Sequence, residues 1–179
     1  SVGEKCVYSD HHFLLLGMML EEVTEKKLPQ LLEEYLNQPL KTQFTYSPDK
    51  EKTIPTAAIF SKEGLWEKNL QGEVHDPKAK IFGGVAGHAG VFGRLEDLEK
   101  LLNNLVNFGS FFTKNELNLI SEDQTKGLLR SAGFKLYPVG DHFAFSHTGY
   151  TGTLLIGDAT LKKGFIFLSN RVHLKDERA

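Results

Sequence analysis

The sequence contains a single cysteine, Cys6, which excludes an internal disulfide and any zinc site built from several cysteines. Free thiols prefer burial, so we expect Cys6 to be a small buried apolar residue. The sequence also has no block of lysine and arginine, and its formal net charge is only -2. Nucleic-acid and anionic-membrane partners need concentrated positive charge and are therefore not indicated.

Long apolar runs are missing as well. The longest, Phe13 to Leu20, is interrupted by Gly17 and is too short to span a bilayer. Residues 1–10 do not show the basic-then-apolar pattern of a signal peptide, but a mature or truncated chain would look the same. The compartment is therefore left open.

Several catalytic signatures are absent from the sequence. It has no H-E-x-x-H zinc motif and no G-x-S-x-G nucleophile elbow. The glycine-rich run at 83–90 is not followed by Gly-Lys-Ser/Thr, so it does not predict a phosphate-binding loop.

The first part of the chain has the apolar periodicity of helices. Phe13, Leu16, Leu20 and Val23 form one stripe, and Ser9 and Asp10 are suitable residues to begin that helix. Further helices are expected at 29–37, at 95–107 with Gly109 as a C-terminal cap, and after the capping-box pair Thr113 and Glu116. Residues 40–83 lack a long periodic run and are expected to be irregular.

From Gly133 onward the pattern changes to strands, in segments near 134–136, 143–156 and 165–168. The predicted fold class is therefore α+β: residues 1–130 mainly helical and irregular, and residues 131–179 a three-stranded antiparallel sheet. Three strands make a small sheet with exposed edges. We therefore expect residues 1–179 to form a single, incomplete domain.

Five short segments, taken together and in order, indicate a protein family much more specifically than any one of them alone. Tyr8-Ser9-Asp10 stands at a predicted helix start, and His147-Thr148-Gly149 lies on a predicted strand. Between them lie 72–76 (GEVHD) and 87–92 (GHAGVF), and 167–173 (FLSNRVH) follows. This ordered set resembles the β-lactamase-related serine hydrolases, which include class C β-lactamases, penicillin-binding proteins and esterases. The resemblance implies a partial β-lactamase/transpeptidase-like fold.

The resemblance also implies roles for individual residues. Tyr8 would be the general base or proton relay, and Asp10 occupies the position usually held by asparagine. His147 and Thr148, followed by Gly149, would hold the carboxylate or acyl group of a small acyl substrate. The Tyr150 N–H would be one of two oxyanion donors. Family members work by an acyl-enzyme on a β-lactam, an ester or a D-alanyl peptide, without metal or organic cofactor.

Three residues between the motifs have a structural and a functional interpretation. His88, among glycine and alanine residues, is expected to fix its loop by hydrogen bonds, with contact to the substrate pocket as the alternative. His75 and Asp76 are expected to anchor a loop. A metal-dependent hydrolase that uses His75, Asp76 and His88 is the weaker alternative.

The family's first motif, Ser-x-x-Lys, belongs upstream of Tyr8, where only seven residues stand in this sequence. Ser47-Pro48-Asp49-Lys50 has the Ser-x-x-Lys spacing, but it follows Tyr8-Ser9-Asp10 (the tyrosine motif) in the sequence, and its composition predicts a turn. We therefore expect a fragment of such a hydrolase that lacks the nucleophile. Its exposed sheet edges could pair with a separate N-terminal half or with a second copy of the chain. The alternative is a non-catalytic remnant that binds a ligand or a partner.

Overall fold

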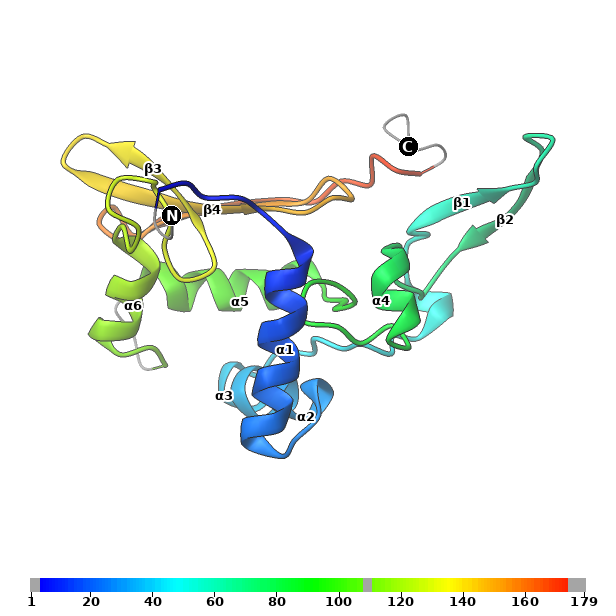
Figure 1. Ribbon diagram of the computed structural model, residues 1–179, viewed down its shortest axis with the longest axis horizontal. Coiled ribbons are helices and arrows are strands. Elements are labelled where there is room, and N and C mark those ends of the chain that lie inside the picture. The colour runs from blue at the N-terminus through cyan, green and yellow to red at the C-terminus, as the bar shows by residue number, and fades with distance from the viewer. Residues whose placement is uncertain (1–3, 108–110, 174–179) are drawn as a thin grey trace. The chain divides into compact units, whose positions relative to one another are not determined.

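The computed structural model describes residues 4–107 and 111–173, which form two compact units (Figure 1). One unit comprises the first eight residues and 95–169, and the other comprises 9–94 and 170–179. We refer to them as the sheet unit and the helical unit, and each is described by itself. The expectation of a single domain stays a prediction.

The sheet unit is built from two helices and four strands. In chain order these are α5 (Leu95–Val106), α6 (Lys114–Ser121), β3 (Lys135–Val139), β4 (His142–Thr148), β5 (Leu154–Asp158) and β6 (Lys163–Phe167). The strands form one antiparallel sheet in the order β3-β4-β5-β6. Gly109 lies outside the described residues, whereas the capping box of Thr113 and Glu116 is confirmed at the start of α6.

The predicted α+β class is confirmed, but the C-terminal sheet has four strands where three were predicted. Residues 143–156 were expected as a single strand, and they form β4 and β5 with a tight turn between them. The Gly149 N–H donates to the Thr153 carbonyl, and the Gly152 N–H donates to the Gly149 carbonyl. Gly152 has φ +107°, which favours glycine and lets the chain reverse.

The core of the sheet unit lies between α5 and the sheet. Its buried members are Leu102, Leu105, Val106, Leu136 and Phe145. Two glycines make the close packing feasible: a Cβ at position 157 would lie 2.1 Å from Phe145 Cζ, and one at position 164 would lie 2.4 Å from Leu102 Cδ2. The absence of side chains at these two strand positions therefore leaves room for large apolar ones.

Short elements make up the helical unit. It begins with α1 (Asp10–Thr24), and a continuous helical segment follows, composed of α2 (Leu28–Leu32), a π-helical turn (Glu33–Asn37) and α3 (Gln38–Leu40). A 3₁₀ turn (Lys50–Lys52) precedes the hairpin of β1 (Ala57–Phe60) and β2 (Trp66–Leu70), and α4 (Pro77–Ile81) comes last. The region 40–83, expected to be irregular, thus contains a hairpin and a short helix.

Asn37 connects the helical segment of this unit to the chain that follows it. Its side-chain amide donates to the Phe44 carbonyl, and its oxygen accepts from the Phe44 N–H and from the Thr42 hydroxyl. Asn37 is buried, so these hydrogen bonds satisfy polar atoms whose burial without partners would destabilise the fold. Thr45, a little further on, pairs with Phe92, two residues after the glycine-rich run, through two backbone hydrogen bonds.

The expected burial of Cys6 is wrong. Cys6 is exposed, and its Sγ accepts a hydrogen bond from Arg130 Nε at 3.3 Å. The physical reason is local: the segment 5–8 is exposed throughout, so the thiol has no core to enter. Among the described residues, no helix has both the length and the apolar character that crossing a membrane requires.

Candidate functional site

The tyrosine motif stands at the N-terminus of α1. Ser9 is the N-cap, with extended backbone angles, and its hydroxyl accepts a hydrogen bond from the His11 N–H. Asp10 is the first helical residue, where a carboxylate interacts favourably with the helix dipole. The predicted helix start is therefore confirmed. Tyr8, just before it, is 64% exposed.

Asp76 begins α4 in a similar way. Its carboxylate accepts the Ala79 N–H, and Pro77 occupies the first helical position, where its missing N–H costs nothing. The same Oδ1 lies 2.8 Å from Nε2 of His88. Burial raises the pKa of Asp76, but the bonds from Ala79 and His88 outweigh it, so the pKa lies below its ordinary value.

His88 is almost fully buried, with its side chain 3% exposed. A carboxylate can only accept, so the ring presents Nε2–H to Asp76. The other ring nitrogen, Nδ1, is buried and has no hydrogen-bond partner within the part of the chain that the structure describes. Structural anchoring of the loop by His88 and Asp76 therefore agrees with this geometry, and its role in function stays a prediction.

The glycine-rich loop lies directly against α1. Ala86 and Ala89 form a bridge, so Gly87 and His88 make a tight turn between them. A Cβ at Gly87 would lie 2.2 Å from the Phe13 carbonyl oxygen and 3.1 Å from the Gly17 Cα. Only a residue without a side chain fits this close approach of two backbones. Gly17 interrupts the apolar run of the helix because it forms the other half of this contact.

Lys78 connects α4 to the tyrosine motif. Its Nζ lies 2.8 Å from Asp10 Oδ2, and the hydrogen bond raises the pKa of Lys78 above its ordinary value. Sequence reasoning missed this residue, because Lys78 stands with Lys80 in a short segment that carries no recognised motif. The available signal was Asp10 itself, since a carboxylate in place of the usual asparagine calls for a countercharge.

The segment of the third motif forms the end of β4 and the turn after it. His147 pairs with Leu155, and Thr148 pairs with Leu154, the last pair before the chain reverses. The His147 ring lies edge-on to Phe134, with centroids 6.4 Å apart. A Cβ at Gly149 would lie 2.1 Å from Thr153 Oγ1, so this turn also requires glycine.

The exposure of the third motif differs from that of the strand before it. His147, Thr148 and Tyr150 are exposed, whereas residues 144–146 are buried. The polar groups of the motif thus lie on the surface at the end of β4, and the residues of β4 just before them are buried.

The predicted site residues fall into two groups. Tyr8, His147, Thr148, Gly149 and Tyr150 belong to the sheet unit, and Asp10, His75, Asp76 and His88 belong to the helical unit. Within the helical unit, ligand atoms of Asp10, Asp76 and His88 all lie within 4.8 Å of one another. The meeting of Tyr8 with His147 in one pocket stays a prediction.

The cluster of Asp10, Asp76 and His88 has side chains that could bind a metal ion. The weaker sequence alternative named His75 in place of Asp10, and His75 is not part of the cluster among the described residues. The Lys78 ammonium already occupies one carboxylate of the set. A positive side chain at 2.8 Å disfavours a second cation at the same oxygen.

The Ser-x-x-Lys spacing at residues 47–50 lies on the surface of the helical unit. Ser47 and Lys50 are both exposed, Asp49 caps the 3₁₀ turn, and Lys50 Nζ pairs with Glu73 at 2.8 Å. The Lys50 ammonium is thus directed to Glu73, and the expectation that these residues are not the family's first motif stays a prediction.

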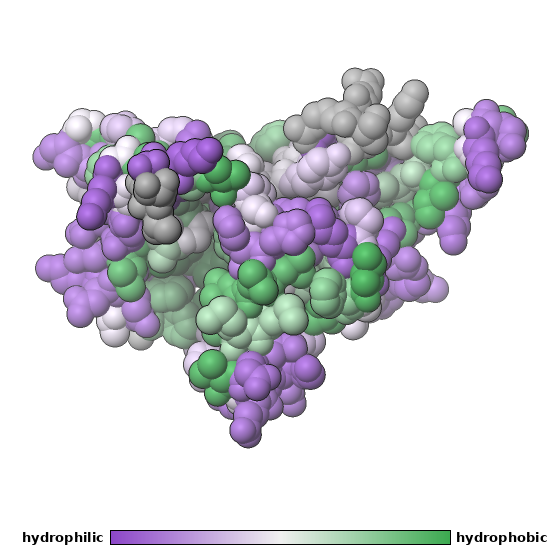
Figure 2. All heavy atoms as spheres, in the orientation of Figure 1, coloured by the Kyte–Doolittle hydropathy of each residue, from purple (hydrophilic) through white to green (hydrophobic). Residues whose placement is uncertain are grey.

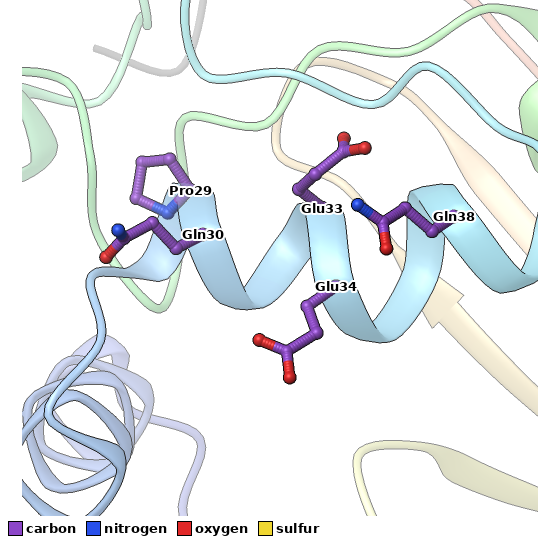
Figure 3. A pocket seen from close by; sticks show the side chains of 5 residues that line it. All are labelled: Pro29, Gln30, Glu33, Glu34 and Gln38. Atoms are coloured by element: carbon purple, nitrogen blue, oxygen red, sulfur yellow. The ribbon is translucent and has the colours of Figure 1, made fainter.

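A hollow of about 590 Å³ lies elsewhere in the helical unit (Figure 3). It is lined by Pro29, Gln30, Glu33, Glu34 and Gln38, which project from a single helical segment. Glu34 forms an ion pair with Lys26. The hollow contains none of the motif residues and has no nucleophile, so we assign it no chemistry.

The architecture and the motifs define the class of the molecule. The solved structure of EstCE1, a hydrolase with promiscuous acyltransferase activity, matches 92% of this chain and 51% of its own, with TM-score 0.64 and 16% identity. The octameric penicillin-binding protein homologue from Pyrococcus abyssi matches 90% of this chain and 38% of its own, with TM-score 0.64 and 18% identity. The chain has the β-lactamase/penicillin-binding-protein fold.

Sequence comparison then gives the family. The Beta-lactamase family model matches residues 1–179, and the chain belongs to this family of serine hydrolases. The N-acetylmuramyl-L-alanine amidase of Bacillus subtilis is 32% identical over 96% of this chain and 45% of its own length. A putative D-alanyl-D-alanine carboxypeptidase of Escherichia coli is 29% identical over 96% of this chain and 46% of its own length. The chain thus spans about half the length of these curated relatives.

The contact between the glycine loop and α1 can be tested by substitution. Gly87→Ala should lower the free energy of unfolding by about 1–3 kcal/mol, because the new Cβ overlaps the Phe13 carbonyl. Urea unfolding followed by circular dichroism measures the change.

Gly64→Ala is a comparison for backbone strain without a clash, and the position of the loop, rather than the size of the stability loss, distinguishes the two variants. Gly64 has φ +79° and open space around it, so the cost there is backbone strain of roughly 1–2 kcal/mol without a clash. A crystal structure of the Gly87→Ala protein should show the loop displaced from α1. An undisplaced loop with unchanged stability would contradict the close-contact interpretation.

Proposed function

We propose that these residues supply the second and third motifs of a serine hydrolase that works through an acyl-enzyme. One observation supports this most directly. Over a chain matched throughout by the family model, Tyr8-Ser9-Asp10 opens a helix and His147-Thr148-Gly149 ends a strand. These are the positions at which the family's motifs are expected.

In the proposed reaction a serine hydroxyl attacks a carbonyl carbon, and the leaving group departs as the acyl-enzyme forms. Tyr8 accepts the serine proton and passes it to the leaving group. His147 and Thr148 bind the carboxylate or acyl group of the substrate from the end of β4. The backbone N–H of Tyr150 stabilises the oxyanion, together with the backbone N–H of the nucleophilic serine as the second donor. Water then hydrolyses the acyl-enzyme, and no metal or organic cofactor takes part.

The nucleophile and its lysine come, in this proposal, from polypeptide outside the 179 residues. The exposed position and the Glu73 partner of Lys50 argue against the internal Ser-x-x-Lys match. The curated relatives are about twice as long as the segment that matches this chain, which leaves room in them for a further motif.

The substrate class follows from the names of two relatives. One is named an amidase of N-acetylmuramyl-L-alanine and another a putative D-alanyl-D-alanine carboxypeptidase. We therefore favour a D-alanyl or muramyl peptide over a β-lactam or a simple ester. An exposed histidine and threonine beside each other, as in His147-Thr148, suit a substrate with a free carboxylate.

Two surfaces are suited to bind the polypeptide that would carry the nucleophile. Apolar side chains gather over α1, where Leu15, Leu16, Met18, Met19 and Val23 are exposed (Figure 2). In the sheet unit, β3 and β6 are the outer strands among the described residues. The start of β3 is already covered on its outer side, where Lys135 bridges Arg130 and the Leu136 N–H donates to the Leu129 carbonyl. Pro138 lacks an N–H and blunts the β3 edge, so β6 is the better edge for another strand.

The first prediction concerns activity. This chain alone should neither hydrolyse a chromogenic cephalosporin or a D-alanyl-D-alanine peptide nor gain the mass of an acyl adduct with penicillin. Mixed with the portion of the Bacillus subtilis relative outside the matching segment, it should turn over and show an adduct on that portion only. Absorbance and intact-mass spectrometry measure the two readouts. An adduct on this chain would contradict the proposed location of the nucleophile.

The second prediction concerns the proton relay. In the complemented enzyme, Tyr8→Phe should lower kcat roughly 10²–10⁴-fold, because the ring remains and the transferable proton is lost. Tyr35→Phe removes a hydroxyl from another exposed tyrosine and should leave kcat unchanged. Equal effects of the two substitutions would sink the assignment of Tyr8.

A non-catalytic role is the second candidate function. The exposed apolar face of α1 supports it, because apolar patches of this kind mark surfaces that bind a partner. In that case the chain binds a second copy or another polypeptide and does not take part in hydrolysis.

Sedimentation velocity tests this alternative. Self-association should give a concentration-dependent dimer, and Met19→Glu on the apolar face of α1 should shift it to monomer. Lys62→Glu, a charge change in the β1–β2 hairpin turn, serves as the control. A chain that stays monomeric over a wide concentration range would count against self-association.

A further inference from the structure

We infer that Lys78 is a positioning residue for Asp10 of the tyrosine motif, and that its ammonium takes the place of a metal ion at the carboxylate pair of Asp10 and Asp76. The Nζ lies 2.8 Å from Asp10 Oδ2, with the two side chains 43% and 31% exposed. Lys78 lies two residues after Asp76 in the sequence, on the helix that Asp76 caps. The inference concerns the helical unit alone, where all three residues lie.

The need for a cation follows from the crowding of charge. Oxygens of Asp10 and Asp76 and a nitrogen of His88 lie within 4.8 Å of one another. Two carboxylates at such a distance repel each other, and the energy rises as water is excluded. In many proteins a divalent metal resolves such an arrangement. Here the Lys78 ammonium bonds to one carboxylate, and the His88 N–H bonds to the other.

These bonds connect three elements in a closed circuit. Asp10 begins α1 and is bound through Lys78 to α4, and Asp76 at the start of α4 is bound to His88 in the glycine loop. The neighbouring Gly87 then returns to α1 at the Phe13 carbonyl. The first turn of α1 is therefore held at two points, and this fixes its rotation about the helix axis.

The functional consequence rests on the proposed function. An asparagine side chain can donate and accept hydrogen bonds, whereas the Asp10 carboxylate can only accept. The Asp10–Lys78 pair provides both capacities: the carboxylate accepts, and the partly exposed ammonium retains donors beyond the one bound to Asp10. The pair thus supplies both hydrogen-bonding capacities of the asparagine amide that usually stands at this position in the family that the sequence resembles.

A double-mutant cycle tests this inference. The variants are Lys78→Met, Asp10→Asn and the double substitution, together with Lys78→Arg as the conservative rescue. Lys78→Met should lower the urea midpoint of the chain, and in the Asp10→Asn background it should have little effect, because no unpaired carboxylate is left behind. Lys78→Arg should restore most of the midpoint. Lys80→Met, an exposed lysine of the same helix, is the control and should change nothing.

The complemented enzyme adds a functional readout. Lys78→Met should lower kcat/KM at least tenfold with Asp10 present and less than twofold in the Asp10→Asn background. If complementation yields no activity at all, the proposed function fails, and the unfolding cycle still decides the inference.

Two results would overturn it. The first is additivity, in which Lys78→Met costs the same stability with aspartate or asparagine at position 10. The second is a tightly bound zinc ion in equilibrium dialysis of the unmodified chain with Zn²⁺, lost on Asp10→Asn, because a metal would then be the cation of this cluster. Absence of bound zinc together with strong coupling in the cycle supports the internal ammonium.

Discussion

The close approach of Gly87 to α1 is the constraint on which the candidate site of the helical unit depends. A side chain at Gly87 would overlap the Phe13 carbonyl, and Gly17 is the matching gap in the helix. Because the loop reaches the helix backbone, His88 and its partner Asp76 lie close to Asp10 at the start of that helix, with ligand atoms of the three residues within 4.8 Å of one another. The polar cluster is therefore a consequence of steric fit, and its hydrogen bonds form where two glycines allow the backbones to meet.

The helices were predictable from the sequence because their signals are local. Ser9 before an apolar stripe, and Thr113 three residues before Glu116, identify two helix starts within one turn. The division of residues 143–156 into two strands was missed, because the glycines at 149 and 152 stand within a continuous β-rich pattern. Whether such a glycine interrupts or reverses a strand depends on hydrogen bonds such as that between Gly149 and Thr153.

The candidate site was predictable only as a set of residue types. The ordered motifs indicated the family, and the family model over residues 1–179 agrees with them. The partner of Asp10 could not be read from sequence, since 68 residues separate it from Lys78. The prediction that Cys6 is buried was wrong for a related reason. Burial depends on what packs over a segment, and Cys6 lies on the surface beside the Arg130 guanidinium.

One edge of the four-stranded sheet carries a proline, and the other does not. Pro138 removes an N–H from β3, so strand addition there would lack a hydrogen bond, whereas β6 has no such obstacle. A sheet that can grow at one end only cannot propagate into a fibre by edge-to-edge stacking. Two copies joined through β6 would use up both growing edges, and the assembly would close after a single step.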